Sequence, residues 1–255
     1  MIAAGLILSY LLLKHERMNT LVNQDSSELV DMSMVGSVTI ILPTLNEEDS
    51  VEQSLFDLED QNVRLAYPEF FEVIVADSES VDRTVQLASN FDVSVFNVVR
   101  GKLNAIDAVM RHARGDIIVA VDADSRYAPN FLNLMLNHFV DSEVVGVSGS
   151  GLYDGYPLVS VLRESIASML PRMTGRGSAY RKDAYFSVGG FDLSIDQTDS
   201  FAMVNEEEFG LWSRLSQIGK VVNEDRASVL TSARRIDCML GAKNDYCQSL
   251  GKDRF

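Results

Sequence analysis

From Ser37 onward, short apolar runs rich in β-branched residues alternate with stretches whose apolar residues recur at helical spacing. This alternation is typical of a parallel sheet whose strands are joined by crossover helices. Five strands are predicted, at residues 38–42, 71–76, 93–98, 116–121 and 144–147. The helices between them are predicted at residues 50–60, 81–90, 102–114 and 129–139, with Asp82 as a cap and Pro129 in a first turn. The predicted fold class is therefore α/β, with a mostly parallel sheet flanked by helices.

The first 36 residues differ from the rest. An apolar segment covers residues 1–17, and its core at residues 2–13 spans about 18 Å as a helix, against a hydrocarbon thickness of ~30 Å. It therefore cannot span a bilayer alone, which leaves a peripheral membrane anchor and a packing helix as alternatives. Lys14 and Arg17 follow it and favour a cytoplasmic position for the body. Residues 18–36 are polar and predict a connector.

Charge and cysteine content exclude several classes of protein. The chain of 255 residues has 22 Lys and Arg against 37 Asp and Glu, a formal net charge of −15, which opposes binding to nucleic acid. Its two cysteines, Cys238 and Cys247, are too few for a disulfide scaffold, so we expect a reducing, cytoplasmic location. With 46% hydrophobic residues, the chain can fill the core of one mixed domain.

Polar residues gather where three of the predicted strands end, at residues 43–48, 77–80 and 122–125. Carboxyl ends of parallel strands form one edge of a sheet, where ligands bind. Turn and cap chemistry explains each segment alone, but the three together favour a binding site.

Asp122 and Asp124 flank one small residue directly after a predicted strand. Two carboxylates at this spacing suit Mg²⁺ or Mn²⁺ held jointly with a diphosphate. An aspartyl phosphatase would place such a motif after its first strand, and a dinucleotide oxidoreductase would need a glycine-rich turn where residues 43–46 stand. Both alternatives are therefore disfavoured.

Further segments follow one another in a definite order along the chain. They are residues 38–48 (VTIILPTLNEE), 73–84 (VIVADSESVDRT), 113–116 (ARGD), 121–124 (VDAD), 177–182 (GSAYRK), 189–192 (GGFD) and 205–215 (NEEEFGLWSRL). This ordered series resembles one family, the family 2 glycosyltransferases with the GT-A fold. The resemblance covers about residues 37–235. It implies one catalytic domain at 37–255, with a nucleotide-binding half at 37–150, an α+β acceptor half at 151–235 and a tail at 236–255.

The resemblance also implies roles for single residues, given in this numbering. It implies a UDP- or GDP-sugar as donor, a glycan or lipid-linked acceptor, and Mn²⁺ or Mg²⁺ as cofactor. The nucleotide would contact Pro43, Thr44, Asn46, Glu47, Asp77, Lys102 and Asp122. Glu47 would lie near the ribose, Asp77 would contact the base, and Asp122 and Asp124 would hold the metal and diphosphate. Lys102 is equally well explained as a solvated lysine at a helix start.

Two departures from the family pattern affect the expected site. Asp77 is followed by Ser78 and Glu79, where the family commonly has a second acid and Gly. The acceptor-side motif, which usually ends in Glu-Asp, is here residues 205–208 (NEEE). The alignment puts Glu206 at the position of the catalytic base, with Glu207 as the next candidate, and predicts transfer with inversion. Acidic residues at a helix N-terminus are the plain alternative.

Three further residues are weaker candidates on the acceptor or diphosphate side. Trp212 is a candidate acceptor wall, although packing is the better explanation of a lone tryptophan. Arg234 and Arg235 are candidates for contact with the diphosphate, and surface charge explains them equally well. The alternatives for the whole chain are a nucleotidyltransferase or pyrophosphatase on a similar sheet, and a non-catalytic protein that binds nucleotide sugars.

Overall fold

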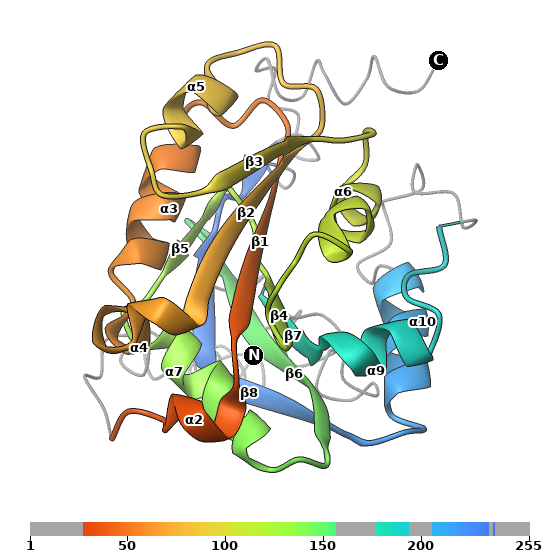
Figure 1. Ribbon diagram of the computed structural model, residues 1–255. Coiled ribbons are helices and arrows are strands. Elements are labelled where there is room, and N and C mark those ends of the chain that lie inside the picture. The colour runs from red at the N-terminus through yellow and green to blue at the C-terminus, as the bar shows by residue number, and fades with distance from the viewer. Residues whose placement is uncertain (1–27, 157–176, 194–205, 235–236, 238–255) are drawn as a thin grey trace, which may run out of the picture.

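The computed structural model describes residues 28–156, 177–193, 206–234 and 237. These residues build one eight-stranded sheet with the strand order β3-β2-β1-β4-β7-β6-β8-β5. Helices lie on both sides of it, with α3, α4 and α5 on the left and α6, α9 and α10 on the right in Figure 1. The predicted α/β class with a mostly parallel, flanked sheet is confirmed.

The first four strands in sheet order are parallel and follow the sequence-based prediction closely. They are β1 (Val38–Thr44), β2 (Phe71–Asp77), β3 (Ser94–Asn97) and β4 (Ile117–Ala120). Asp116 was expected inside the fourth strand but precedes it, because its carboxylate accepts hydrogen bonds from the backbone N–H and the hydroxyl of Ser37. The alternation of short apolar runs therefore predicted the strands in this half of the sheet correctly.

The other half of the sheet is more irregular. It consists of β5 (Ser125–Tyr127), β6 (Val144–Tyr153), β7 (Ser178–Arg181) and β8 (Lys220–Thr231). β7 runs antiparallel to β4 and β6, β8 runs parallel to β6, and β5 runs antiparallel to β8. Only β6 was predicted, and it continues to Tyr153 instead of ending at Val147. β5 and β7 are too short for a periodic signal, and charged residues interrupt the apolar pattern of β8.

Helices are found in all four predicted stretches and are shorter than predicted, and the structure adds helices at residues 32–35, 62–66, 68–70, 182–187 and 206–215 that were not among the four. The elements are α2 (Met32–Val35), α3 (Val51–Glu59), α4 (Asn62–Ala66), η1 (Pro68–Phe70), α5 (Thr84–Ala88), α6 (Lys102–Met110), α7 (Phe131–Leu136), η2 (Asn137–Val140), α9 (Lys182–Ser187) and α10 (Glu206–Leu215). Asp82 was expected to cap α5 but lies one residue before the N-cap, which is Arg83; its carboxylate still accepts from the backbone N–H of Thr84, the first residue of that helix. Pro129 lies just outside α7, whose N-cap is Asn130.

Two apolar clusters hold the helices on the two faces of the sheet. In β1, Ile40 and Leu42 belong to the cluster beneath α3 and α7, while Ile41 belongs to the cluster beneath α6 and α10. All three side chains are fully buried. A strand buried on both faces has a nearly continuous apolar sequence, which explains why β1 was easy to predict.

The end of the predicted connector is part of the core. Val30, Met32 and Val35 are buried, and the carboxylate of Asp31 caps α2 by accepting from the backbone N–H of Ser33. The apolar segment at residues 2–13 lies outside the described residues, so the anchor and the packing helix both stay predictions. Within the described residues, no helix has the length and apolar character needed to cross a membrane.

A close approach between β6 and α10 fixes the helix against the sheet. The ring of Trp212 lies over Gly146, so that a Cβ at Gly146 would be 3.0 Å from Cη2 and 3.2 Å from Cε3 of that ring, and closer still to Cζ3. Trp212 is 5% exposed and belongs to the same apolar cluster as Leu211 and Leu215. Glycine is therefore required here by space and not by backbone conformation.

We expect Gly146→Ala to lower the free energy of unfolding by about 1–3 kcal/mol, because the added methyl overlaps the tryptophan ring. Urea unfolding of Gly146→Ala, of Trp212→Leu and of the double variant measures this. In a Trp212→Leu background the cost of Gly146→Ala should fall to less than about 1 kcal/mol, since the overlapping ring atoms are gone. An equal cost in both backgrounds would show that the ring is not what excludes a side chain at Gly146.

Candidate functional site

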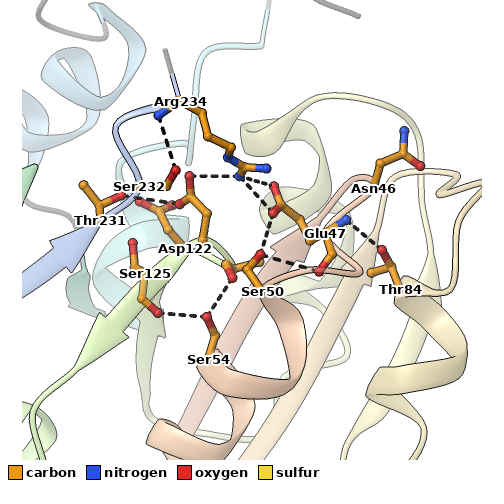
Figure 2. Close-up of polar contacts among 12 residues, drawn as sticks. Asn46, Glu47, Ser50, Ser54, Thr84, Asp122, Ser125, Thr231, Ser232 and Arg234 are labelled. Atoms are coloured by element: carbon orange, nitrogen blue, oxygen red, sulfur yellow. Dashed lines mark hydrogen bonds and ion pairs between the residues drawn. The ribbon is translucent and has the colours of Figure 1, made fainter. Parts of the chain in front are cut away.

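The register of the parallel strands brings the three polar segments to one edge. Thr44 at the end of β1 pairs with Asp77 at the end of β2, and Asp77 pairs with Asn97 at the end of β3. β4 ends at Ala120, after which the backbone N–H of Val121 donates to the carbonyl of Ile41. Figure 2 shows residues of the first and third segments, such as Glu47 and Asp122, near Arg234, which follows β8. The second segment joins the first, because the backbone N–H of Asn46 donates to the hydroxyl of Ser80. The predicted convergence at the carboxyl edge is therefore confirmed.

Asp77 ties the ends of β1 and β2 together. Its carboxylate accepts from the hydroxyls of Thr44 at 2.8 Å and Ser80 at 2.6 Å, and from the backbone N–H of Ser80 at 2.9 Å. Asp77 is 2% exposed. These three hydrogen bonds occupy much of its acceptor capacity, so any contact with a base would have to use what remains on Oδ2.

The first loop, after β1, is hydrogen-bonded along its length to the loop after β2. The backbone N–H of Asn46 donates to the hydroxyl of Ser80, and its side-chain carbonyl accepts from the backbone N–H of Val81. The backbone N–H of Glu47 donates to the hydroxyl of Thr84 at 2.7 Å (Figure 2). Asn46 has a positive φ of 53°, which asparagine tolerates better than most residues. Pro43 precedes this loop, as the next-to-last residue of β1, and is half-buried.

The segment that carries Asp122 and Asp124 is held by two hydroxyls. The Tyr127 hydroxyl accepts from the backbone N–H of Asp122 at 2.7 Å and donates to its carbonyl at 3.0 Å. The Ser54 hydroxyl, on α3, lies 2.7 Å from the carbonyl oxygen of Ala123 and 2.8 Å from that of Ser125. The hydroxyls of Tyr127 and Ser54 thus fix the backbone of this segment. Its two carboxylate side chains are the part that can change conformation.

Two cations face these carboxylates. Lys102, the first residue of α6, places its ammonium 2.5 Å from Oδ1 of Asp122. Arg234, just after β8, places Nη2 3.0 Å from Oδ2 of Asp124, and 2.8 and 2.9 Å from the two carboxylate oxygens of Glu47. Figure 2 shows Arg234 reaching Glu47 in this way. Of the predicted site, the structure therefore brings Glu47, Lys102, Asp122, Asp124 and Arg234 together.

Burial and charge shift the acid–base properties of this cluster. Burial raises the pKa of Glu47, and the neighbouring Asp124 adds to this, although Arg234 and Ser50 oppose it. Burial would lower the pKa of Arg234, but the hydrogen bonds and charges of Glu47 and Asp124 outweigh burial and raise it. Burial also raises the pKa of Tyr127, so the hydroxyl that holds Asp122 stays protonated. Arg234 is therefore a permanent cation between two carboxylates.

The donor set suits a divalent metal that is shared with a ligand. Within the described ranges, no three His, Cys, Asp or Glu side chains lie close enough to enclose an ion. Asp122 and Asp124 offer hard oxygen donors from a fixed backbone, and their side chains are 18% and 26% exposed. Mg²⁺ commonly binds one or two carboxylates and completes its shell with phosphate oxygens and water. The chemistry of the residues thus fits Mg²⁺ or Mn²⁺ bound together with a diphosphate.

A cavity of about 440 Å³ adjoins Asp124. Its other polar lining residues include Arg126, Asp154, Tyr156, Thr231 and Asp237. The Tyr156 hydroxyl donates to Asp237 at 2.6 Å, which links the end of β6 to the segment after β8. Carboxylates and hydroxyls in such a space can accept and donate hydrogen bonds to a polyhydroxylated ligand.

Helix α10 begins at Glu206, and its direction follows from its neighbours. Its last turns lie beside the start of β6, where Trp212 meets Gly146, and the chain then enters β8 at Lys220, opposite Val144. The helix therefore runs antiparallel to β8, and its first residues lie toward the carboxyl edge of the sheet (Figure 1). The side chains of Glu206 and Glu207, and all of Arg235, lie outside the described residues. Trp212 is almost fully buried and has little surface to offer an acceptor.

Several residues of the site were not found from the sequence. Tyr127 and Ser54 act on the backbone of the carboxylate segment, and their positions on β5 and α3 give no motif. Thr84 ends the matched segment 73–84, but no role was assigned to it from the sequence. The pairing of Glu47 with Arg234 joins residues 187 positions apart in the chain. Only the spacing of Tyr127, five residues after Asp122, is a local signal.

Comparisons with known proteins add to this geometry. A mannosyltransferase from Pyrobaculum calidifontis, solved in complex with GDP-Man and Mn²⁺, has a TM-score of 0.60 at 23% identity, over 88% of this chain and 64% of that one. Dolichol-phosphate mannosyltransferase from Pyrococcus furiosus is 25% identical over 146 residues, 53% of this chain and 40% of that protein. Undecaprenyl-phosphate 4-deoxy-4-formamido-L-arabinose transferase from Pseudomonas fluorescens is 31% identical over 103 residues, 37% of this chain and 30% of that protein.

The similarity to the solved structure concerns the fold, which is that of a GT-A glycosyltransferase. The matches to the two curated relatives span less than half the length of each. The family model described as glycosyl transferase family 2 matches residues 39–193, which is more than half of the chain and runs from β1 past α9. The chain therefore belongs to glycosyl transferase family 2.

Proposed function

We propose that this protein transfers a sugar from a nucleoside-diphosphate sugar to an acceptor hydroxyl, with a divalent metal and with inversion at the anomeric carbon. The observation that carries the proposal is the cluster at the carboxyl edge, where Asp122 and Asp124 lie beside Lys102 and Arg234. Carboxylates for a metal and cations for phosphates are the groups that a leaving nucleoside diphosphate requires. Membership of the family supports glycosyl transfer as the reaction.

In this proposal Asp122 and Asp124 hold Mg²⁺ or Mn²⁺. When bound, the metal offsets negative charge on the departing nucleoside diphosphate. Tyr127 and Ser54 keep the two carboxylates in place by fixing the backbone between them. Lys102 at the start of α6 contacts the phosphates, and its pairing with Asp122 supports this position.

The loops after β1 and β2 bind the nucleoside. Pro43 and Thr44 at the end of β1 contribute with Asn46 and Glu47 of the first loop. Thr84 and Ser80 hold this loop against the second. Asp77 acts mainly by joining the two loops, because three internal hydrogen bonds already use its carboxylate. Base selection then depends on the shape of this pair of loops more than on Asp77 alone.

Glu206 is the proposed base, with Glu207 as the alternative. It takes the proton of the acceptor hydroxyl while the oxygen attacks the anomeric carbon and the bond to the diphosphate breaks. One displacement of this kind inverts the anomeric centre. The direction of α10, whose first turn lies toward the carboxyl edge, supports a base at this helix start.

The acceptor is proposed to be a lipid-linked or protein-linked glycan. Two of the relatives carry names of transferases that act with dolichol phosphate or undecaprenyl phosphate, which supports a lipid-linked acceptor. The acid-lined cavity next to Asp124 offers space for the polyhydroxylated part of donor or acceptor. A peripheral membrane contact through residues 2–13, on the cytoplasmic face, is part of the same proposal.

Asp124→Ala should abolish metal-dependent turnover. A panel of UDP- and GDP-sugars with Mn²⁺ or Mg²⁺, scored for nucleoside diphosphate release, measures it. We expect a loss of at least ~10³-fold, because one of two metal carboxylates is gone. Asp225→Asn, an exposed carboxylate on β8, is the control and should keep the wild-type rate. Release of pyrophosphate or inorganic phosphate in place of a nucleoside diphosphate would instead indicate a nucleotidyltransferase or pyrophosphatase.

Glu206→Gln should spare donor binding and slow transfer by about 10²–10⁴-fold, which is the usual contribution of a general base. Donor affinity by calorimetry and single-turnover transfer separate the two effects. Glu208→Gln, on the same first turn of α10, is the matched control and should keep most of the rate. Should Glu207→Gln show the large loss while Glu206→Gln is active, the base would be Glu207.

Tyr127→Phe should weaken Mn²⁺ binding and lower the free energy of unfolding by about 1–3 kcal/mol, because both backbone groups of Asp122 lose their hydroxyl partner. Manganese titration and urea unfolding measure the two effects. Tyr67→Phe, at the end of α4, removes a hydroxyl elsewhere and should leave Mn²⁺ affinity unchanged. Unaltered Mn²⁺ affinity in Tyr127→Phe would mean that the hydroxyl does not hold the metal carboxylates in place.

A further inference from the structure

Arg234 joins two carboxylates that come from distant parts of the chain. Its Nη2 contacts both oxygens of Glu47 and one oxygen of Asp124. The side chains of Arg234, Glu47 and Asp124 are 26%, 14% and 26% exposed, so the contacts are partly shielded from water. The backbone N–H of Arg234 donates to the hydroxyl of Ser232, which holds the start of the side chain near β8. The guanidinium therefore has two contacts with Glu47 and one with Asp124.

A divalent cation on Asp124 and the guanidinium of Arg234 compete for the same carboxylate. Both are positive, because a guanidinium is not deprotonated in proteins. Two like charges on one carboxylate in a partly shielded site repel each other. The diphosphate of a donor changes this balance, since it brings negative oxygens for the metal and for a guanidinium, which pairs well with phosphate.

We propose that Arg234 is an exchangeable counter-ion of Asp124, anchored on Glu47, that makes metal binding depend on the nucleoside diphosphate. This inference rests on the proposed function. The guanidinium leaves Asp124 when metal and diphosphate arrive, stays within reach through Glu47, and turns to the phosphates. Metal and nucleotide then bind cooperatively, and each raises the affinity of the other by the same factor.

The chain offers contrasting arginines and lysines for comparison. Lys102 pairs with Asp122, the other carboxylate of the pair, and its side chain is more exposed than that of Arg234. Arg83 pairs with Glu48 on the neighbouring loop and is 67% exposed. Arg83→Gln therefore removes one positive charge near the site without touching Asp124. Arg234→Lys keeps the charge but replaces the planar guanidinium by a compact ammonium.

The test is a Mn²⁺ titration of the full chain, with and without UDP or GDP. Electron paramagnetic resonance measures the concentration of free Mn²⁺ at each step. In the wild-type protein, the nucleoside diphosphate should tighten Mn²⁺ binding at least about tenfold, within the usual range of coupling between sites. Arg234→Gln should bind Mn²⁺ alone about tenfold more tightly than wild type, and the gain from nucleotide should shrink. Arg83→Gln should behave as wild type, and Arg234→Lys should retain the weak binding of Mn²⁺ alone.

Mn²⁺ binding by Arg234→Gln that is no tighter than in wild type would overturn the inference. Equal Mn²⁺ affinity of the wild-type protein with and without nucleoside diphosphate would overturn it too, and this measurement needs no variant. Asp124→Asn separates the inference from the proposed function. If Asp124→Asn loses Mn²⁺ while Arg234→Gln gains nothing, only the inference fails. If Asp124→Asn binds Mn²⁺ as wild type does, the metal assignment fails, and the inference fails with it.

Discussion

The contact of Arg234 with Glu47 and Asp124 is the interaction on which the arrangement of the site depends. It joins the end of β8 to the loop after β1 and to the segment after β4. Loss of one partner from a buried ion pair commonly costs about 3–5 kcal/mol, and the value here should be lower because each side chain keeps some exposure. Without the arginine, two partly buried carboxylates would face each other. The cation therefore lets the acidic residues of the site lie close together.

The sheet explains how residues so far apart come together. The parallel register of β1, β2 and β3 puts their ends side by side, and β4 adds Asp122 and Asp124 to the same edge. β8 then returns Arg234 to this edge from the other end of the chain. Each loop is held by hydrogen bonds from its neighbours, so the fold supplies a rigid frame and the side chains supply the charge.

The sequence predicted the parallel half of the sheet and the convergence of its polar loops, because strands buried on both faces carry a clear apolar signal. It did not predict β5 or β7, which are short, or β8, whose apolar pattern is broken by residues 223–226. The spacing of Asp122 and Asp124 after a predicted strand identified them as candidates, and the family resemblance implied a role for Lys102. The partners of Arg234, the internal hydrogen bonds of Asp77 and the packing of Trp212 against Gly146 depend on tertiary contacts, which no local pattern encodes.

The pairing of β5 with β8 has a consequence for how much of the chain the carboxylate segment needs. Ser125 pairs with Thr231, and the backbone N–H of Ser232 donates to the carbonyl of Asp124 itself at 3.0 Å. The Asp-x-Asp segment is thus held by backbone hydrogen bonds to a strand that lies more than a hundred residues later in the chain. A fragment that stopped after residue 193 would contain both aspartates and nearly all of the family's motifs. It would lack β8 and Ser232, whose backbone hydrogen bonds hold the two aspartates in position. The part of the chain that carries most of the motifs is therefore shorter than the part that is needed to hold the site in its structure.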